Sequence, residues 1–330
     1  MPFDPFETRR VGATQVEIPR LGLGTAPLGG WPEAISRETG AATVRRAWDR
    51  GVRFFDTAPF YGAGQAELFL GEALADKPRA DLRISTKTGR RLLPGADEVA
   101  FFRDAQPFHS VFDFSADGVA AAIGESRERL GLGAPDIVLV HDPDEHHSDV
   151  LRMAYPKLRA MRDAGEFGAL GVGMNFVEPL ARFAQEADFD VFLLAGRYTL
   201  LEQTALDELF PLAQERGISI IAGGVFNSGL LIAPAEGAMF DYAPVSRETL
   251  DKAMALEAAC REFDVPLRAA ALQFAAAHSA VTSVVIGART PQEVDDAFAS
   301  AGLTIPAELW VELKHRGLVR EDAPVPGQGR

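Results

Sequence analysis

The sequence predicts an α/β fold, a (β/α)8 TIM barrel, from three observations. Eight short segments rich in apolar and β-branched residues alternate with longer segments, most of them amphipathic. Several of the short segments are near-continuous apolar runs, which is typical of strands buried on both faces. This pattern continues along the chain without a linker, so we expect residues 1–330 to form a single barrel domain.

The expected strands are separated by segments that leave room for helices. Strands are predicted at residues 20–24, 53–56, 82–86, 136–140, 169–173, 191–195, 218–222 and 283–287. Helices are predicted at residues 38–50, 116–130, 149–164, 204–216 and 290–301. Ser115 and Thr290 are suited to cap helix N-termini. Gly131, Gly165 and Gly217 stand where three helices would end.

Two segments interrupt this alternation. Residues 90–114 contain turn residues and five Phe, and they are too long for a plain connection between a strand and a helix. Residues 246–264 have the pattern of an additional helix between the seventh and eighth strands. Because the connections that follow barrel strands face the active-site end, we expect both segments to lie outside the eightfold repeat and near that end.

A doubly wound sheet is the alternative fold. If it bound a dinucleotide, it would carry Gly-x-Gly-x-x-Gly directly after a strand. Both candidates fail at the third glycine, where Glu67 follows residues 62–64 and Phe176 follows residues 171–173. The sequence also lacks Gly-x-x-x-x-Gly-Lys-Ser/Thr, which excludes P-loop chemistry.

Composition excludes several classes of protein. The 33 Lys and Arg against 47 Asp and Glu give a net charge of −14, which argues against nucleic-acid binding. The single cysteine, Cys260, excludes an intrachain disulfide and a multi-thiolate metal site. The N-terminus resembles no export signal, and the apolar runs are far shorter than a membrane span. We therefore expect a cytoplasmic protein that binds neither membranes nor nucleic acid.

Polar residues stand at the carboxyl ends of the second, third and fourth expected strands. Asp56, Lys87 and His141 occupy these positions, and Lys87 is one of only five lysines in the chain. Each has a structural explanation when taken alone: a turn carboxylate, a lysine reaching for water, and a turn histidine. In a barrel, however, the three strand ends meet at one mouth. Tyr61, five residues after Asp56, can reach back over this group.

This combination has a chemical logic. Tyrosine, with an ordinary pKa near 10, is a poor acid or base at neutral pH, but a neighbouring lysine ammonium stabilises the phenolate. Asp56 would hold Lys87 in place, and His141 would hydrogen-bond the same substrate oxygen and orient it. The expected chemistry is metal-free proton transfer at a carbonyl or alcohol oxygen. Its missing partner is a hydride carrier.

These motifs resemble those of the aldo-keto reductase family. Residues 56–62, Asp-Thr-Ala-Pro-Phe-Tyr-Gly, resemble its signature Asp-Thr-Ala-x-x-Tyr-Gly. Residues 85–87 resemble its lysine strand, 140–141 its histidine strand, 287–291 its adenosine-phosphate loop and 21–25 its first strand. The resemblance implies a catalytic tetrad of Asp56, Tyr61, Lys87 and His141, with Tyr61 as the acid/base. It also implies an N-terminal β-hairpin near residues 11–18 that closes the barrel, and extra helices.

Residues 25–29, 56–59 and 141–144 narrow the resemblance. They are similar to the branch of the family that contains D-threo-aldose 1-dehydrogenase, L-fucose dehydrogenase and pyridoxal 4-dehydrogenase. This similarity implies an NAD(P)-dependent oxidoreductase that oxidises the C1 hemiacetal of an aldose of the L-fucose, D-arabinose or L-galactose type to the lactone. Tyr61 would accept the hydroxyl proton while hydride leaves C1 for the nicotinamide. Pyridoxal oxidation and NADPH-dependent reduction of aldehydes or ketones are the alternatives within the family.

The resemblance also assigns a cofactor site, with some departures. Met174 stands where the family has Ser, Arg197 where many members have Gln, and Gly223 where a Tyr stacks on nicotinamide; Phe226 could replace that ring in part. The expected cofactor-binding residues are Thr25, Met174, Asn175, Arg197, Gly224, Val225, Phe226, Asn227, Ser228, Gly229, Leu230, Gly287, Ala288, Arg289, Thr290 and Glu293.

Glu293 favours NAD over NADP, although NADP stays possible. In NADP-preferring members, a cation after the eighth strand pairs with the 2′-phosphate, and Arg289 keeps that cation. The Glu293 carboxylate would repel a 2′-phosphate and could accept from a ribose hydroxyl. As an alternative, Glu293 is an acid in the first turn of a helix, where the dipole favours it.

The resemblance implies Trp31 as a substrate contact, because family members place an aromatic residue near the sugar in the loop after the first strand, and Phe60 is a second expected contact because it neighbours Tyr61. Phe101, Phe102, Phe108 and His109 are candidates for one wall of the site, or for the core of a packed loop. We expect a small-molecule aldose or aldehyde as the substrate. The sequence does not define an oligomeric state.

Two other classes of protein share the barrel. A metal-dependent hydrolase could use the cluster of His141, Asp142, Asp144, Glu145, His146 and His147. Metal barrels draw ligands from several strands, and the first strand here offers none, so we expect no metal site and a solvated helix start at His146 and His147. A non-catalytic nucleotide-binding barrel would have no need to keep Tyr61 and Lys87 together.

Overall fold

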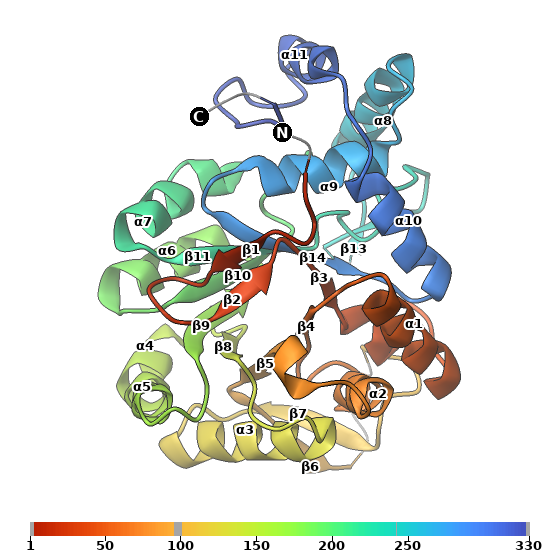
Figure 1. Ribbon diagram of the computed structural model, residues 1–330. Helices are drawn as coiled ribbons and strands as arrows, with labels where there is room; N and C mark the ends of the chain where they lie inside the picture. The colour runs from red at the N-terminus through yellow and green to blue at the C-terminus, as the bar shows by residue number, and fades with distance from the viewer. Residues whose placement is uncertain (1–2, 96–100, 242, 328–330) are drawn as a thin grey trace.

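The structure, a computed structural model, describes residues 3–95, 101–241 and 243–327. Within these residues, eight parallel strands close a barrel, as predicted (Figure 1). The strands are β3 (Leu21–Gly24), β4 (Phe54–Asp56), β5 (Arg83–Thr88), β8 (Ile137–His141), β9 (Ala169–Met174), β10 (Val191–Ala195), β11 (Ser219–Gly223) and β14 (Val281–Gly287). They pair in the order β10-β11-β14-β3-β4-β5-β8-β9, and the two ends of this series meet, since β9 also pairs with β10.

Helices surround the barrel on its outer side (Figure 1). They are α1 (Arg37–Asp49), α2 (Gln65–Leu74), α3 (Ala116–Leu130), α4 (His147–Asp149), α5 (Tyr155–Asp163), α6 (Val177–Glu186), α7 (Leu209–Arg216), α8 (Arg247–Glu262), α9 (Leu267–Ala277), α10 (Pro291–Ala301) and α11 (Ala307–His315). Within the described ranges, no helix is long and apolar enough to cross a membrane.

The predicted caps are confirmed. The Ser115 hydroxyl accepts from Gly118 N–H at 3.0 Å, and the Thr290 hydroxyl accepts from Glu293 N–H at 3.2 Å. Gly131, Gly165 and Gly217 follow helices with φ values of 63°, 79° and 68°. These positive values are the left-handed conformation that ends many helices and that glycine adopts without a steric cost.

Helix prediction was less complete than strand prediction. The helix expected at 149–164 is divided, because α5 begins only after a π-helical turn at Val150–Ala154. Pro156 has no N–H to continue the ordinary pattern of hydrogen bonds, which accounts for the irregular turn. Helices α2, α6, α9 and α11 were not predicted. Most residues of α2 and α9 are buried, so these two helices do not show the one-sided apolar stripe of a surface helix.

An N-terminal hairpin closes the end of the barrel at which the strands begin. Its strands are β1 (Thr8–Arg10) and β2 (Glu17–Pro19), so the predicted hairpin is confirmed with its turn, rather than its strands, at residues 11–16. Val11, Val16 and Ile18 belong to the apolar cluster that fills the barrel interior. Gly12 crosses the barrel edge at a φ of 52°, where a Cβ would lie 2.7 Å from the Asp190 carbonyl oxygen.

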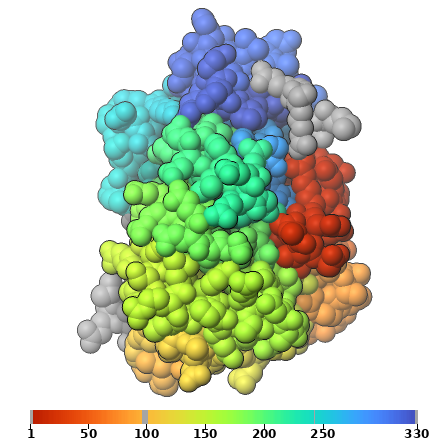
Figure 2. All heavy atoms as spheres, turned by 90° about the vertical axis from the view of Figure 1, so that its left-hand side faces the viewer, coloured from red at the N-terminus to blue at the C-terminus, as the bar shows by residue number. Residues whose placement is uncertain are grey.

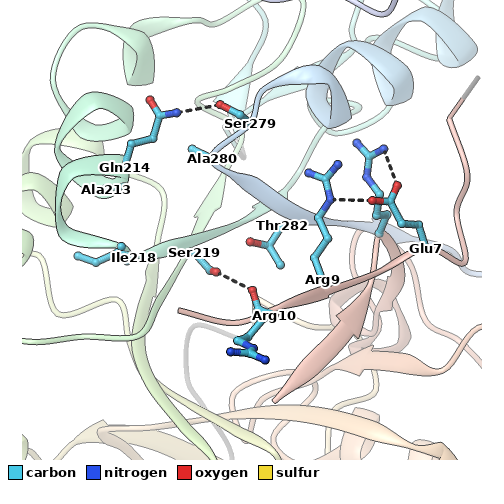
Figure 3. Close-up of a pocket in the computed structure, with 12 residues that line it drawn as sticks. Glu7, Arg9, Arg10, Ala213, Gln214, Ile218, Ser219, Ser279, Ala280 and Thr282 are labelled. Atoms are coloured by element: carbon cyan, nitrogen blue, oxygen red, sulfur yellow. Dashed lines mark hydrogen bonds and ion pairs between the residues drawn. The ribbon is translucent and has the colours of Figure 1, made fainter. Parts of the chain in front are cut away.

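A hollow of about 810 Å³ lies beside this hairpin (Figure 3). Arg9, Arg20 and Glu7 line it, and the Glu7 carboxylate lies 3.4 Å from Arg9 and 3.5 Å from Arg20. Arg9 also donates to the Val281 carbonyl and Arg20 to the Ala276 carbonyl, at 3.2 and 2.5 Å. These side chains therefore fasten the N-terminal segment to the closed end of the barrel.

The two segments predicted to interrupt the repeat are confirmed as additions to it. Residues 90–114 contain an antiparallel hairpin of β6 (Arg90–Pro94) and β7 (Phe108–Phe112). Residues 246–264 contain α8, which follows a second small hairpin, β12 (Met239–Phe240) with β13 (Ala243–Pro244). In Figure 2, α8 (cyan) lies on the side of the molecule opposite the N-terminal hairpin (red), as expected for segments that follow strands.

Candidate active site

A buried ion pair lies at the carboxyl ends of β4 and β5. The Lys87 Nζ lies 2.7 Å from Asp56 Oδ2 and donates to the Thr57 carbonyl at 2.9 Å. The other carboxylate oxygen of Asp56 accepts from the Ser85 hydroxyl at 2.6 Å. The two charged side chains are only 1% and 4% exposed. Their mutual contact compensates for the loss of water, so neither charge can be removed alone without a large cost.

Tyr61 lies over this pair, on the loop between β4 and α2. The Lys87 Nζ is 4.6 Å from the centre of the Tyr61 ring. The loop turns sharply at Gly62, where φ is 64° and a Cβ would lie 2.7 Å from the Gly29 carbonyl oxygen. The loop after β3 and the loop after β4 approach each other closely at this point, and the contact holds Tyr61 above the ends of β4 and β5.

His141 completes the group from the end of β8. Its ring stands edge-on to the Tyr61 ring, with 5.7 Å between the centres and an angle of 88°. Burial lowers the pKa of His141 well below its usual value, and the cations of Lys87 and Arg90 lower it further. The imidazole is therefore neutral at physiological pH. Its buried Nδ1 has no hydrogen-bond partner in the part of the chain that the structure describes.

The structure thus brings together all four residues predicted for the tetrad. A lysine beneath an aromatic ring and a neutral histidine at its edge can bind one substrate oxygen and exchange a proton with it. Sequence reasoning missed Ser85, which hydrogen-bonds Asp56, and Arg90, which stands close to His141. The position of Arg90, directly after Gly89 at the end of a strand, was the available signal.

An aromatic wall stands beside the tetrad. The rings of Trp31 and Phe101 are stacked with 5.8 Å between centres and an angle of 3°. The Phe60 ring stacks on Phe101 at 6.3 Å and meets Phe102 edge-on at 5.3 Å. Both predicted substrate contacts therefore lie on this wall, with two of the four residues predicted from the insertion. Phe108 and His109 lie instead on β7, paired with the residues of β6.

The residues predicted to bind a cofactor lie at or after the ends of five other strands. Met174 ends β9 as a buried side chain, and Asn175 follows it, half-buried. Thr25 follows β3, and its hydroxyl donates to the Asp56 carbonyl oxygen at 3.0 Å. Arg197 follows β10 and makes a two-pronged ion pair with Asp241, at 3.0 and 2.5 Å, which the sequence did not predict.

The loop after β11 is tightly turned. Gly224, Asn227, Ser228 and Gly229 all have positive φ, between 45° and 92°. The Phe226 and Ser228 N–H groups make no hydrogen bond to any described residue. The buried Asn227 Oδ1 likewise lacks a partner in the described ranges, while Asn227 Nδ2 donates to the Gly196 carbonyl at 3.3 Å. The segment that includes Val225 and Leu230 therefore presents spare polar groups beside the barrel mouth.

The loop after β14 carries the last predicted group. Gly287 ends β14, and the buried Ala288 follows it. The Glu293 carboxylate accepts from Arg289 N–H at 2.8 Å, and this contact gives it a helix-capping position. The Arg289 guanidinium lies 3.3 Å from Glu33, on the loop after β3. Its buried Nε has no partner among the residues described.

The alternative metal cluster does not assemble. Within the described residues, no three His, Cys, Asp or Glu side chains are grouped as a metal site requires. His146 packs against Phe112 and Phe114, while His147 is buried against Phe183. The expectation of a solvated helix start is therefore wrong for His147, because an aromatic ring of α6 covers it.

Comparison with known proteins agrees with this geometry. The sequence profile described as the Aldo/keto reductase family matches residues 20–315. The chain is 40% identical to D-threo-aldose 1-dehydrogenase of a Pseudomonas species, over 93% of this chain and 96% of that one. It is 39% identical to pyridoxal 4-dehydrogenase of Microbacterium luteolum, over 95% and 98%. In structure it resembles the holo form of an aldo-keto reductase from Bacillus halodurans, with a TM-score of 0.75, 22% identity, and 98% and 99% coverage.

Proposed function

The chain belongs to the aldo/keto reductase family, and within it we propose an NAD-dependent dehydrogenase that oxidises the C1 hemiacetal of an aldose to the lactone. The observation that carries the proposal is the buried Lys87–Asp56 pair beneath Tyr61, with a neutral His141 at the edge of that ring. We also propose that residues 1–330 form a single barrel domain.

In the proposed reaction, Tyr61 accepts the proton of the C1 hydroxyl group. The Lys87 ammonium stabilises the phenolate that this requires, and Asp56 holds the ammonium beneath the ring. His141 hydrogen-bonds the same substrate oxygen and orients C1. A bound nicotinamide supplies the acceptor for the hydride that leaves C1. The pair of electrons on oxygen then completes the carbonyl group of the lactone.

The residues at the other strand ends fit a nicotinamide dinucleotide. The partnerless Asn227 Oδ1 and Arg289 Nε are buried polar atoms of the kind that a ligand satisfies. The spare N–H groups of Phe226 and Ser228 suit the oxygens of a pyrophosphate. We propose NAD over NADP because the Glu293 carboxylate, in the first turn of α10, accepts from Arg289 N–H in the loop after β14 and would repel a 2′-phosphate.

Pyridoxal oxidation is the second candidate, favoured by the aromatic wall. The near-parallel rings of Trp31 and Phe101 can stack on a flat pyridine ring. The same rings can cover the C–H face of a sugar, so they suit either substrate. The relative of the chain at 39% identity is named for pyridoxal, and the relative at 40% is named for aldoses. The two substrates therefore need a direct comparison.

The test is NADH formation, followed as absorbance at 340 nm. Purified protein is mixed with NAD and, separately, L-fucose, D-arabinose, L-galactose or pyridoxal, with NADP and EDTA as controls. We expect turnover with an aldose that EDTA does not affect. Tyr61→Phe should lower kcat by roughly 10²–10⁴-fold, because it removes the proton acceptor and leaves the ring.

Other outcomes redirect the proposal. Turnover with pyridoxal alone would transfer it to the second candidate. Consumption of NADPH with aldehydes, and no NADH formation from any sugar, would make the protein a reductase. Full activity in Tyr61→Phe would remove the proposed acid/base from the mechanism.

A further inference from the structure

Arg90 occupies an unusual position beside the tetrad. It is the first residue of β6, and its guanidinium lies between two aromatic rings, 4.5 Å from the centre of Phe60 and 4.1 Å from that of Phe112. It donates to Asp142 Oδ2 at 3.0 Å. A guanidinium held between two rings and bound to a carboxylate has little freedom to turn, so its charge is placed accurately.

The same carboxylate oxygen faces the tetrad histidine. Asp142 Oδ2 lies 3.6 Å from His141 Nε2, just outside hydrogen-bond distance. Asp142 adopts a φ of 44°, in the left-handed region, and this backbone conformation follows directly after the end of β8. Asp142 Oδ2 therefore lies between the Arg90 guanidinium and the His141 imidazole, and it is hydrogen-bonded to the guanidinium.

We propose that Arg90 is a positioning residue for His141, because by holding the Asp142 carboxylate it leaves the imidazole N–H available to the substrate oxygen. The proposal rests on the proposed function, in which His141 orients the C1 hydroxyl. If Arg90 were absent, the nearest strong acceptor for Nε2–H would be the Asp142 carboxylate, and the imidazole would pair with it.

The charges around His141 indicate how its pKa should change when Arg90 is removed. Lys87 from β5 and Arg90 from β6 are the nearby cations, Asp142 is the adjacent anion, and Asp56 is bound to Lys87. Tyr61 faces the imidazole from the loop after β4. Burial raises the pKa of the Asp142 carboxyl, and Arg90 lowers it. Removal of Arg90 deletes a cation beside the imidazole and leaves the imidazole as the nearest base to this carboxyl, and both changes favour the imidazolium form.

The test is an NMR titration of the His141 ring in Arg90→Met, assigned with His141→Gln. In the parent protein, we expect the ring to titrate well below the usual histidine range, because burial and the nearby cations lower its pKa. In Arg90→Met, the midpoint should move into roughly pH 6–8, as for an imidazole paired with a carboxylate. The acidic limb of the pH profile of kcat/KM should move upward with it.

Arg91→Met is the matched control. Arg91 is the next residue on β6, but its guanidinium is bound to Glu125 of α3, outside the tetrad. The same substitution there should leave the His141 titration and the pH profile unchanged. A shift of equal size in Arg91→Met would overturn the proposal, because any loosening of the hairpin would then suffice.

Rescue by a second substitution tests the route through Asp142. In Arg90→Met/Asp142→Asn the carboxylate is gone, so His141 should again stay neutral. If Arg90→Met does not fold, Arg90→Gln, which removes the charge but keeps a donor, should give a smaller upward shift. An unshifted His141 in every folded Arg90 variant would overturn the inference. Because the titration needs no turnover, its outcome is separate from that of the NADH assay.

Discussion

The two ends of the barrel hold similar charged groups in very different surroundings. At the mouth, Lys87 and Asp56 are almost fully buried. At the closed end, Glu7 lies between Arg9 and Arg20 with about half of its side chain exposed, at distances of 3.4 and 3.5 Å. Water screens the second cluster, whereas the first depends on each partner to compensate for the other.

Unpartnered polar atoms sharpen the contrast. His141 Nδ1, Asn227 Oδ1 and Arg289 Nε are buried near the mouth without partners in the described residues. At the closed end, the guanidinium groups of Arg9 and Arg20 reach backbone carbonyls as well as Glu7. Similar chemistry thus fastens the chain at one end, while at the other it leaves polar atoms for a ligand.

The largest expected effect is that of Lys87→Met. It leaves the Asp56 carboxylate buried without its cation, so the free energy of unfolding should fall by roughly 3–5 kcal/mol. The matched change at the closed end, Arg9→Met, should cost about 1 kcal/mol or less. Chemical denaturation measures both. Equal losses would contradict the contrast, and adding Asp56→Asn to Lys87→Met should restore stability but not turnover.

The next effect concerns acid and the buried histidine His278 near the closed end. Burial lowers the pKa of His278, which lies near the closed end, to about 4. The unfolded chain, with an ordinary histidine pKa near 6.5, takes up the proton first as the pH falls. The His278 contribution to stability is therefore complete above pH 6.5 and is lost progressively towards pH 4.

Denaturation at several pH values checks this expectation with His278→Asn, whose side-chain oxygen can replace the Nδ1 that accepts from Ala280 N–H at 3.1 Å. The variant should show a flatter dependence of stability on pH between 6.5 and 4. Parallel curves for the parent and the variant would show that His278 does not cause the acid sensitivity.

A smaller effect is expected at the start of α10, beside the barrel mouth. Glu293→Gln removes a negative charge but keeps a side-chain oxygen for Arg289 N–H. NADP affinity should rise by roughly fivefold, as for the loss of about 1 kcal/mol of repulsion. NAD affinity should change little. Glu308→Gln, also in the first turn of a helix, is the control, and calorimetric titration of both nucleotides is the measurement.

The smallest effect is expected for Glu7→Gln at the closed end. An exposed ion pair contributes about 0–1 kcal/mol, and salt screens it, so the loss should shrink further at high ionic strength. The rate of NADH formation should be unchanged, because Glu7 lies at the opposite end of the barrel from the tetrad. A large loss of turnover would show that the two ends are coupled.

The sequence was sufficient to predict the barrel and the four residues that meet at its mouth. Eight apolar runs predicted the strands to within a few residues, and polar residues at the strand ends predicted which side chains would meet. Both follow from local rules: burial on two faces requires continuous apolar residues, and parallel strands bring their carboxyl ends together. The motif at residues 56–62 added the tyrosine.

The surroundings of these residues depend on contacts between distant parts of the chain. Helices α2 and α9 escaped prediction because burial on all sides removes the amphipathic pattern. The contact of Arg90 with Asp142 and the pair of Arg197 with Asp241 join residues 52 and 44 positions apart in the chain. Sequence spacing does not encode such contacts, since they depend on how separate loops pack over the same mouth, and there the electrostatics of His141 are set.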